Sequence, residues 1–126
     1  MAAGLAEKHK ALVNLNWEKQ ITPRNERSMS NFALVLPRDF SDYEWEVTAK
    51  GWFSEGQLSF SGKHYRLNFY DRGRLNQQIE SELQGGNVFF EPNLLVINSV
   101  TRAEMERATE FLVQSGLTRF LIAEKE

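Results

Sequence analysis

The chain has 126 residues, of which 41% are hydrophobic and 25% are charged. This length and this apolar content suffice for the core of one domain. The formal net charge of −2 gives no overall attraction to nucleic acid or to an anionic membrane. The sequence contains no cysteine, which excludes disulfides, thiolate metal ligands and a cysteine nucleophile.

No segment of the sequence predicts export or membrane insertion. The first ten residues lack the apolar stretch of a signal peptide. The longest apolar runs, such as 32–36 and 94–97, have only four or five residues, whereas a helix needs about 20 to cross a bilayer. We therefore expect a cytoplasmic protein that has no membrane partner.

The first 30 residues differ in character from the rest of the chain. Residues 4–11 favour a helix, the alternation over 13–17 predicts a strand, and the polar stretch 22–30 with Pro23 predicts a loop. We expect one domain over 1–126, in which 1–30 either folds onto the body or is a loosely attached segment.

Apolar runs and alternating patterns predict a series of strands in the middle of the chain. Pro37 ends the first of them, and turns are expected at 54–56 and 61–62. The segment 43–50 has the clearest alternation of apolar and polar residues. The expected strands cover 31–36, 43–50, 58–60 and 63–70. The last three of these strands predict an antiparallel meander.

A helix is expected directly after the last strand of the meander. Asp71 is suited to be its N-cap, and Gly85 or Gly86 provides a left-handed end. Between them an apolar stripe recurs every four residues at Leu75, Ile79 and Leu83. The stripe predicts a helix with one face packed against the core.

The C-terminal part predicts a strand, a helix and a further strand. Residues 94–98 are apolar, 101–115 open with a capping box, and 119–123 are apolar again. Such a βαβ unit places its two strands parallel in one sheet. The sequence therefore predicts an α+β fold in which the antiparallel meander is extended by the C-terminal βαβ unit into a mixed sheet, with two main helices packed on it.

Catalytic and metal-binding patterns are scarce. The two histidines, His9 and His64, stand apart, and neither lies in the spacing of a zinc site or beside a nucleophile. We assign no catalytic residue, no metal ligand and no cofactor. An enzyme that uses a carboxylate such as Glu91 or Asp71 as acid or base is an alternative, which requires a desolvated pocket.

Basic and aromatic residues are interleaved over 63–74. Strand alternation places Arg66 and Tyr70 on the face opposite to Tyr65, Leu67 and Phe69. Together with Lys63, Arg72 and Arg74, they can offer charge and a stacking ring to a single-stranded nucleic acid. In the alternative interpretation, the aromatic residues belong to the core and the arginines only solubilise the sheet.

Pairs of aromatic residues occur where strands are expected to turn. Phe89 and Phe90 run into Glu91, Pro92 and Asn93, and Trp52 is followed by Phe53. Neighbouring residues of a strand point to opposite faces, so one ring of each pair needs a second layer or a partner to cover it. The candidate contact residues of this kind are Trp52, Phe90, Glu91 and Asn93.

The functional hypothesis that follows is a small, non-enzymatic module that binds another macromolecule. We expect its partner to be another protein or a second copy of the chain, because aromatic pairs at turns are frequent while catalytic groups are scarce. A nucleic-acid-binding module that uses 63–74 is the second hypothesis, and an enzyme with a carboxylate acid or base is the third.

Overall fold

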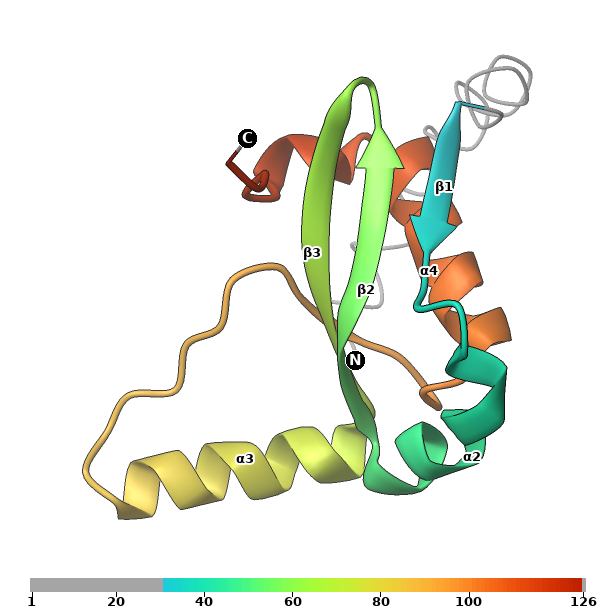
Figure 1. Cartoon of the computed structure of the whole chain (residues 1–126). Helices are drawn as coiled ribbons and strands as arrows, with labels where there is room; N and C mark the ends of the chain where they lie inside the picture. Colours follow the sequence, from blue (N-terminus) through green and yellow to red (C-terminus); the bar gives the residue numbers. More distant parts are fainter. Residues whose placement is uncertain (1–30, 126) are drawn as a thin grey trace, which may run out of the picture.

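The computed structural model of this protein describes residues 31–125 (Figure 1). The helix, the strand and the loop predicted before residue 31 lie outside this range. Between residues 31 and 125, every helix is too short or too polar to cross a membrane. The elements are β1 (Phe32–Val35), α2 (Phe40–Lys50), β2 (Trp52–Phe60), β3 (Lys63–Tyr70), α3 (Arg72–Gln84), β4 (Leu94–Val96), α4 (Arg102–Gln114) and the 3-10 helix η1 (Leu117–Phe120).

The four strands form one mixed sheet in the order β1-β2-β3-β4. β1 and β2 are antiparallel, as are β2 and β3, whereas β3 and β4 are parallel. The turn between β2 and β3 lies at Ser61 and Gly62, which both have positive φ, as the sequence predicts. The predicted α+β fold with a mixed sheet is confirmed.

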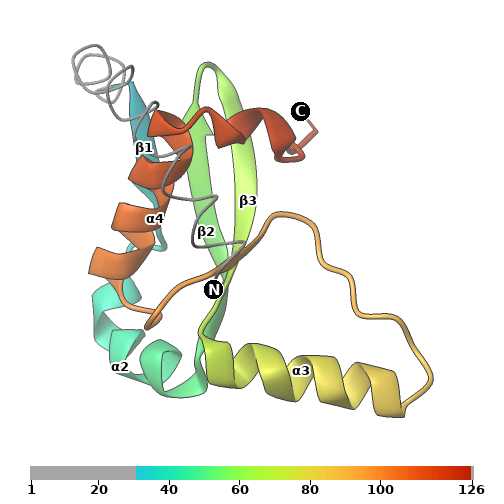
Figure 2. The same ribbon diagram turned by 180° about the vertical axis from the view of Figure 1, so that it is seen from behind.

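The core lies between the sheet and α4, which covers one face of the sheet next to β1 (Figure 2). β3 sends Tyr65, Leu67 and Phe69 to this face, where all three are buried, so the predicted alternation is confirmed. Val100, just before α4, and Met105, in its first turn, complete this part of the core. Apolar burial of this kind is the main stabilising contribution to the fold.

The strand predicted at 43–50 is wrong, because these residues form most of α2. Phe40 and Val47 are buried and Tyr43 packs against the same core. Their spacings of three and four residues are those of one helix face, although α2 is kinked at Tyr43, whose φ of −131° is not helical. Trp45, which the alternation assigns to a buried face, is 69% exposed. The helical pattern becomes visible only when Phe40, which precedes the alternating segment, is included.

The turn predicted at 54–56 is also wrong, because these residues lie inside β2. The register of β2 against β3 shifts between Phe53 and Gly56, which marks a β-bulge. A side-chain carbon at Gly56 would lie 3.3 Å from the Phe69 ring. Gly56 therefore allows close packing within the sheet, and it does not reverse the chain.

The parallel strand pair is not the one that the sequence predicts. α4 follows β4 as expected, and the Thr101 hydroxyl caps it by accepting a hydrogen bond from the Glu104 amide at 3.2 Å. However, η1 and an irregular segment take the place of the strand predicted at 119–123. The βαβ unit is instead β3-α3-β4, with α3 as the crossover helix.

The C-terminal segment still lies along β3, although it forms no strand. The Glu124 amide donates to the His64 carbonyl at 2.7 Å. Asn93, directly before β4, accepts from the Ile122 amide at 2.8 Å and donates to the Ile122 carbonyl at 2.9 Å. A side chain thus makes bonds that a strand would make with its backbone, which explains why the apolar run at 119–123 does not continue the ladder.

Candidate protein-binding site

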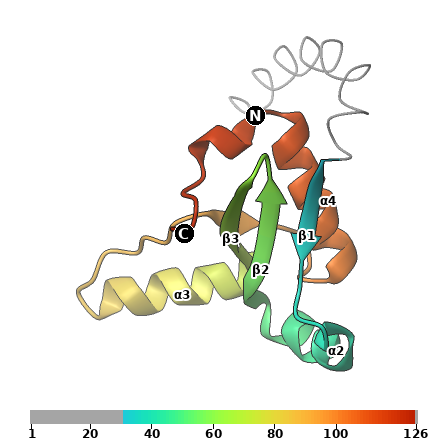
Figure 3. The same cartoon turned by 45° about the horizontal axis from the view of Figure 1, so that its top comes forward.

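Residues 72–91, which we call the arm, leave the body at the end of β3 and return just before β4. They comprise α3 and the loop after it, and they extend away from the sheet on the side opposite to α2 (Figures 1 and 3). Asp71 begins the helix as predicted, because its carboxylate accepts from the Arg74 amide at 2.8 Å. Gly86, with φ of +84°, provides the predicted left-handed end.

The arm exposes apolar side chains to solvent. Leu75 and Ile79 of α3 are half-buried and Leu83 is exposed, and none of the three belongs to the core cluster, so the stripe does not join the core as the sequence predicts. Leu83 is 59% exposed, and the loop adds Val88 at 82% and Phe90 at 77%. Apolar side chains gathered on one projecting element are typical of a surface that another molecule covers.

The base of the arm is fixed by contacts between the strands and the returning loop. The Tyr70 hydroxyl donates to the Glu91 carboxylate at 2.5 Å. The Tyr70 ring lies edge to face with Phe89, with centroids 6.5 Å apart, and its centroid is 6.4 Å from that of Trp52. Because both ends of the arm meet at this cluster, the arm leaves the body at a defined place.

Tyr70 itself is buried, with 3% of its surface exposed. The ring that the nucleic-acid hypothesis expects on the open face is therefore covered. Burial, and next the hydrogen bond to Glu91, raises the pKa of the Tyr70 hydroxyl to about 12. The hydroxyl is thus protonated at neutral pH and donates to Glu91.

Arg74 and Trp52 meet at the same base. The Arg74 guanidinium carbon lies 5.5 Å from the centroid of the Trp52 ring, a cation–π contact. Four of the residues that the sequence singles out, Trp52, Tyr70, Arg74 and Glu91, therefore come together in one cluster. Their contacts with one another hold the arm in place.

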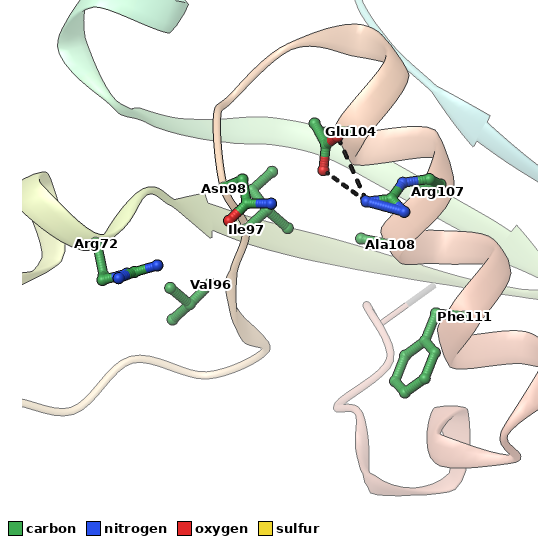
Figure 4. A pocket seen from close by; sticks show the side chains of 8 residues that line it. All are labelled: Arg72, Val96, Ile97, Asn98, Glu104, Arg107, Ala108 and Phe111. Carbon is green, nitrogen blue, oxygen red and sulfur yellow. Dashed lines mark hydrogen bonds and ion pairs between the residues drawn. The ribbon is translucent and has the colours of Figure 1, made fainter. Parts of the chain in front are cut away.

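A hollow of about 390 Å³ lies between the start of the arm and α4 (Figure 4). Figure 4 shows the Arg72 side chain extending toward Val96 on the opposite part of its wall. Glu104 pairs with Arg107 at 3.2 Å, whereas no carboxylate of residues 31–125 pairs with Arg72. The hollow is lined by Arg72, Val96, Ile97, Asn98, Glu104, Arg107, Ala108 and Phe111.

Arg66 and Asn93 lie apart from the arm, beside the C-terminal segment. The Arg66 Nε atom is 3.0 Å from a carboxylate oxygen of Glu124. The Asn93 side-chain amide also donates to the Arg66 carbonyl at 2.8 Å. The structure thus separates Arg66 from Arg72 and Arg74, which the nucleic-acid hypothesis places together on one basic surface.

The two carboxylates named for the enzyme hypothesis both have structural partners. Asp71 accepts from the Arg74 amide, and Glu91 accepts from the Tyr70 hydroxyl. A side-chain carbon at Gly51 would lie 2.6 Å from a carboxylate oxygen of Asp71, so the backbone of α2's last turn packs closely against this group. These contacts fix the position of both carboxylates at the base of the arm.

Sequence reasoning did not identify Leu83 and Val88 as surface residues. It assigned Leu83 to a stripe that faces the core, and it gave Val88 no role. The narrowness of the stripe could have indicated this exposure. Its apolar residues recur only every four positions, and the polar residues Gln78 and Glu82 lie beside them on the helix. A helix that packs on a sheet usually carries a wider apolar face.

Comparisons of the chain with protein-family models, with curated proteins and with solved structures found no match.

Proposed function

We propose that this chain is a non-enzymatic, cytoplasmic interaction module that binds another protein chain through its arm. The observation that carries the proposal is the exposure of the arm's apolar side chains. α3 has 13 residues and buries none of them, while Leu83, Val88 and Phe90 face solvent. A helix that presents a narrow apolar stripe is suited to lie against a complementary apolar surface.

The fixed base of the arm supports this proposal. A surface that is held in place before binding loses less conformational entropy when a partner docks. The bond between Tyr70 and Glu91 and the contact between Arg74 and Trp52 position both ends of the arm without using its exposed apolar side chains. The contacts that hold the arm and the surface offered to a partner are thus made by different residues.

Site-specific crosslinking tests the proposal. A photoreactive phenylalanine analogue is introduced at Val88, on the arm, and in a second variant at Trp45, an exposed apolar residue of α2. The two variants are irradiated in cells, and the products are separated by mass and identified. We expect a covalent adduct with one protein chain at position 88 and none at position 45.

Two results would contradict the proposal. One is the absence of any protein adduct at position 88 although the analogue is incorporated and reacts with free peptide. The other is an equal pattern of adducts at positions 88 and 45, because this would show nonspecific reaction of exposed apolar positions.

A further inference from the structure

We propose that the occupant of the arm is a second copy of this chain, and that two α3 helices pack antiparallel about a two-fold axis near Ile79. The inference rests on the proposed function, since it names the partner that the arm binds. The stripe is symmetric about Ile79, with Leu75 four residues before it and Leu83 four residues after it. In an antiparallel pair, Leu75 of each helix therefore lies at the level of the partner's Leu83.

The charges of α3 are self-complementary in this arrangement. Arg72 continues the stripe at its N-terminal end, since it precedes Leu75 by three residues, and Glu82 borders the stripe at its C-terminal end. With the axis at Ile79, Arg72 lies level with the partner's Gly86, four residues or about 6 Å along the axis from the partner's Glu82, a distance that the long Arg72 side chain can span. Within one chain Glu82 accepts from Gln78 and Asn87, and no cation of residues 31–125 pairs with it. The helix dipoles are also antiparallel, which places the Arg72 cation near the negative end of the partner's helix.

The hollow next to Arg72 extends the same surface. Arg72 belongs both to the stripe and to the lining of the 390 Å³ hollow, whose apolar wall includes Val96 and Ile97. An antiparallel partner brings the end of its own α3, and the loop after it, to this level of the helix. The partner's Val88, which is exposed in the single chain, then has an apolar surface to cover.

The first test measures association of the full-length chain by sedimentation over a range of concentrations. We expect a reversible equilibrium between monomer and dimer, and we expect Ile79→Glu to abolish the dimer. Because Ile79 is only half-buried and lies outside the core cluster, this substitution is expected to leave the monomer folded, which circular dichroism verifies. A wild-type chain that stays monomeric at the highest soluble concentration would overturn the inference, as would an Ile79→Glu variant that dimerises as well as the wild type.

The second test exchanges charges. Arg72→Glu and Glu82→Arg each create like-charge contacts in the dimer, so each is expected to raise the dissociation constant at least about tenfold. Mixing the two variants restores opposite charges at both ends of the helix pair and is expected to favour the heterodimer. Both substitutions suit the dipole of α3 within one chain. Glu82→Arg also removes the acceptor of the Gln78 and Asn87 side chains, so the urea unfolding of each monomer is measured beside the dissociation constant.

Glu80→Arg is the matched control, since it makes the same charge change on α3 away from the stripe. It is expected to leave the dissociation constant within about twofold of the wild type. Equal effects of Glu80→Arg and Glu82→Arg would contradict the antiparallel arrangement about Ile79.

The crosslinking experiment separates this inference from the proposed function. An adduct at position 88 with a second copy supports both. An adduct with a different protein, together with a monomeric chain in sedimentation, overturns the second-copy inference and leaves the proposed function standing. Without any adduct and without a dimer, both are wrong.

Discussion

The Tyr70 hydroxyl and the Glu91 carboxylate form a 2.5 Å hydrogen bond that joins the last residue of β3 to the end of the loop after α3. The two residues are 21 positions apart in the sequence, and Glu91 is the last residue of the arm. One charge-assisted bond thus closes the arm at its base. Its strength decides whether the arm is presented in one orientation or moves relative to the sheet.

Removing this bond is expected to destabilise the protein. Tyr70→Phe leaves the Glu91 carboxylate without its partner at a half-buried place, and we expect a loss of about 1 to 3 kcal/mol in the free energy of unfolding. Urea unfolding at neutral pH measures this change. Glu91→Gln keeps an acceptor for the hydroxyl, so it should cost less than Tyr70→Phe. Equal stability of Tyr70→Phe and wild type would show that the bond does not hold the arm.

The same bond gives the protein a dependence on alkaline pH. The pKa of Tyr70 is raised from 10.0 to about 12 in the folded state by burial and then by the hydrogen bond to Glu91. Its stabilising contribution is therefore complete below pH 10 and is lost as the pH rises through 12. Two pKa units correspond to about 2 to 3 kcal/mol.

Urea unfolding of the wild type and of Tyr70→Phe across this pH range measures the effect. We expect the stability difference between the two chains to shrink as the pH rises, because only the wild type loses the protonated hydroxyl. A difference that stays constant up to the alkaline limit would contradict the raised pKa.

Gly51 and Gly62 form a matched pair for testing close packing. Both have positive φ, of +75° and +78°, so alanine is strained at either position by about 1 to 2 kcal/mol. At Gly51 the new carbon also lies 2.6 Å from a carboxylate oxygen of Asp71, whereas nothing lies within 4 Å at Gly62. Gly51→Ala is therefore expected to lower the melting temperature more than Gly62→Ala. Equal effects would mean that Asp71 moves aside without cost.

Truncation of Ile79 separates the arm from the core. Because Ile79 is half-buried and lies outside the core cluster, Ile79→Ala should cost about 1 kcal/mol or less of monomer stability. Leu67 is completely buried, and Leu67→Ala should cost about 2 to 5 kcal/mol. Unfolding is measured at sub-micromolar chain concentration, where association does not contribute. A large loss for Ile79→Ala would show that the arm packs on the body.

Asn93 is expected to hold the C-terminal segment. Its side chain bonds to both backbone groups of Ile122 and to the Arg66 carbonyl. Asn93→Gly keeps the backbone freedom that its φ of +54° requires but removes these bonds. Hydrogen exchange of the amides in 121–125 should then accelerate at least about tenfold. Asn98→Ala, an exposed asparagine, is the control and should leave this exchange unchanged.

The sequence was sufficient to predict those elements that are stabilised by residues close to them in the chain. β3 was predicted within its observed bounds because alternation and the Ser61–Gly62 turn agree. Asp71 and Thr101 were predicted as caps because each accepts from an amide only three residues away. Each of these interactions joins residues that are close in the chain, so the local sequence is enough to predict it.

The failures share a different physical cause. Residues 43–50 alternate as a strand does, but α2 is selected because Phe40 and Val47 reach the same core as Phe53. The turn predicted at 54–56 fails because Gly56 makes room for Phe69, a residue of another strand. In the first case the alternating segment omits Phe40, which completes the helical pattern, and in the second a side chain of another strand decides the structure. The periodicity of the segment alone records neither.

The sequence by itself named nearly all the residues at the base of the arm, because aromatic pairs, basic residues and turn formers are visible as types. Only the tertiary structure decided what they do. It buries Tyr70 against Trp52 and Phe89, binds Glu91 through the Tyr70 hydroxyl, and leaves the stripe around Ile79 outside the core. An apolar stripe looks the same whether its partner is this chain or another, because the sequence gives the pattern of a helix face and not the surface that covers it.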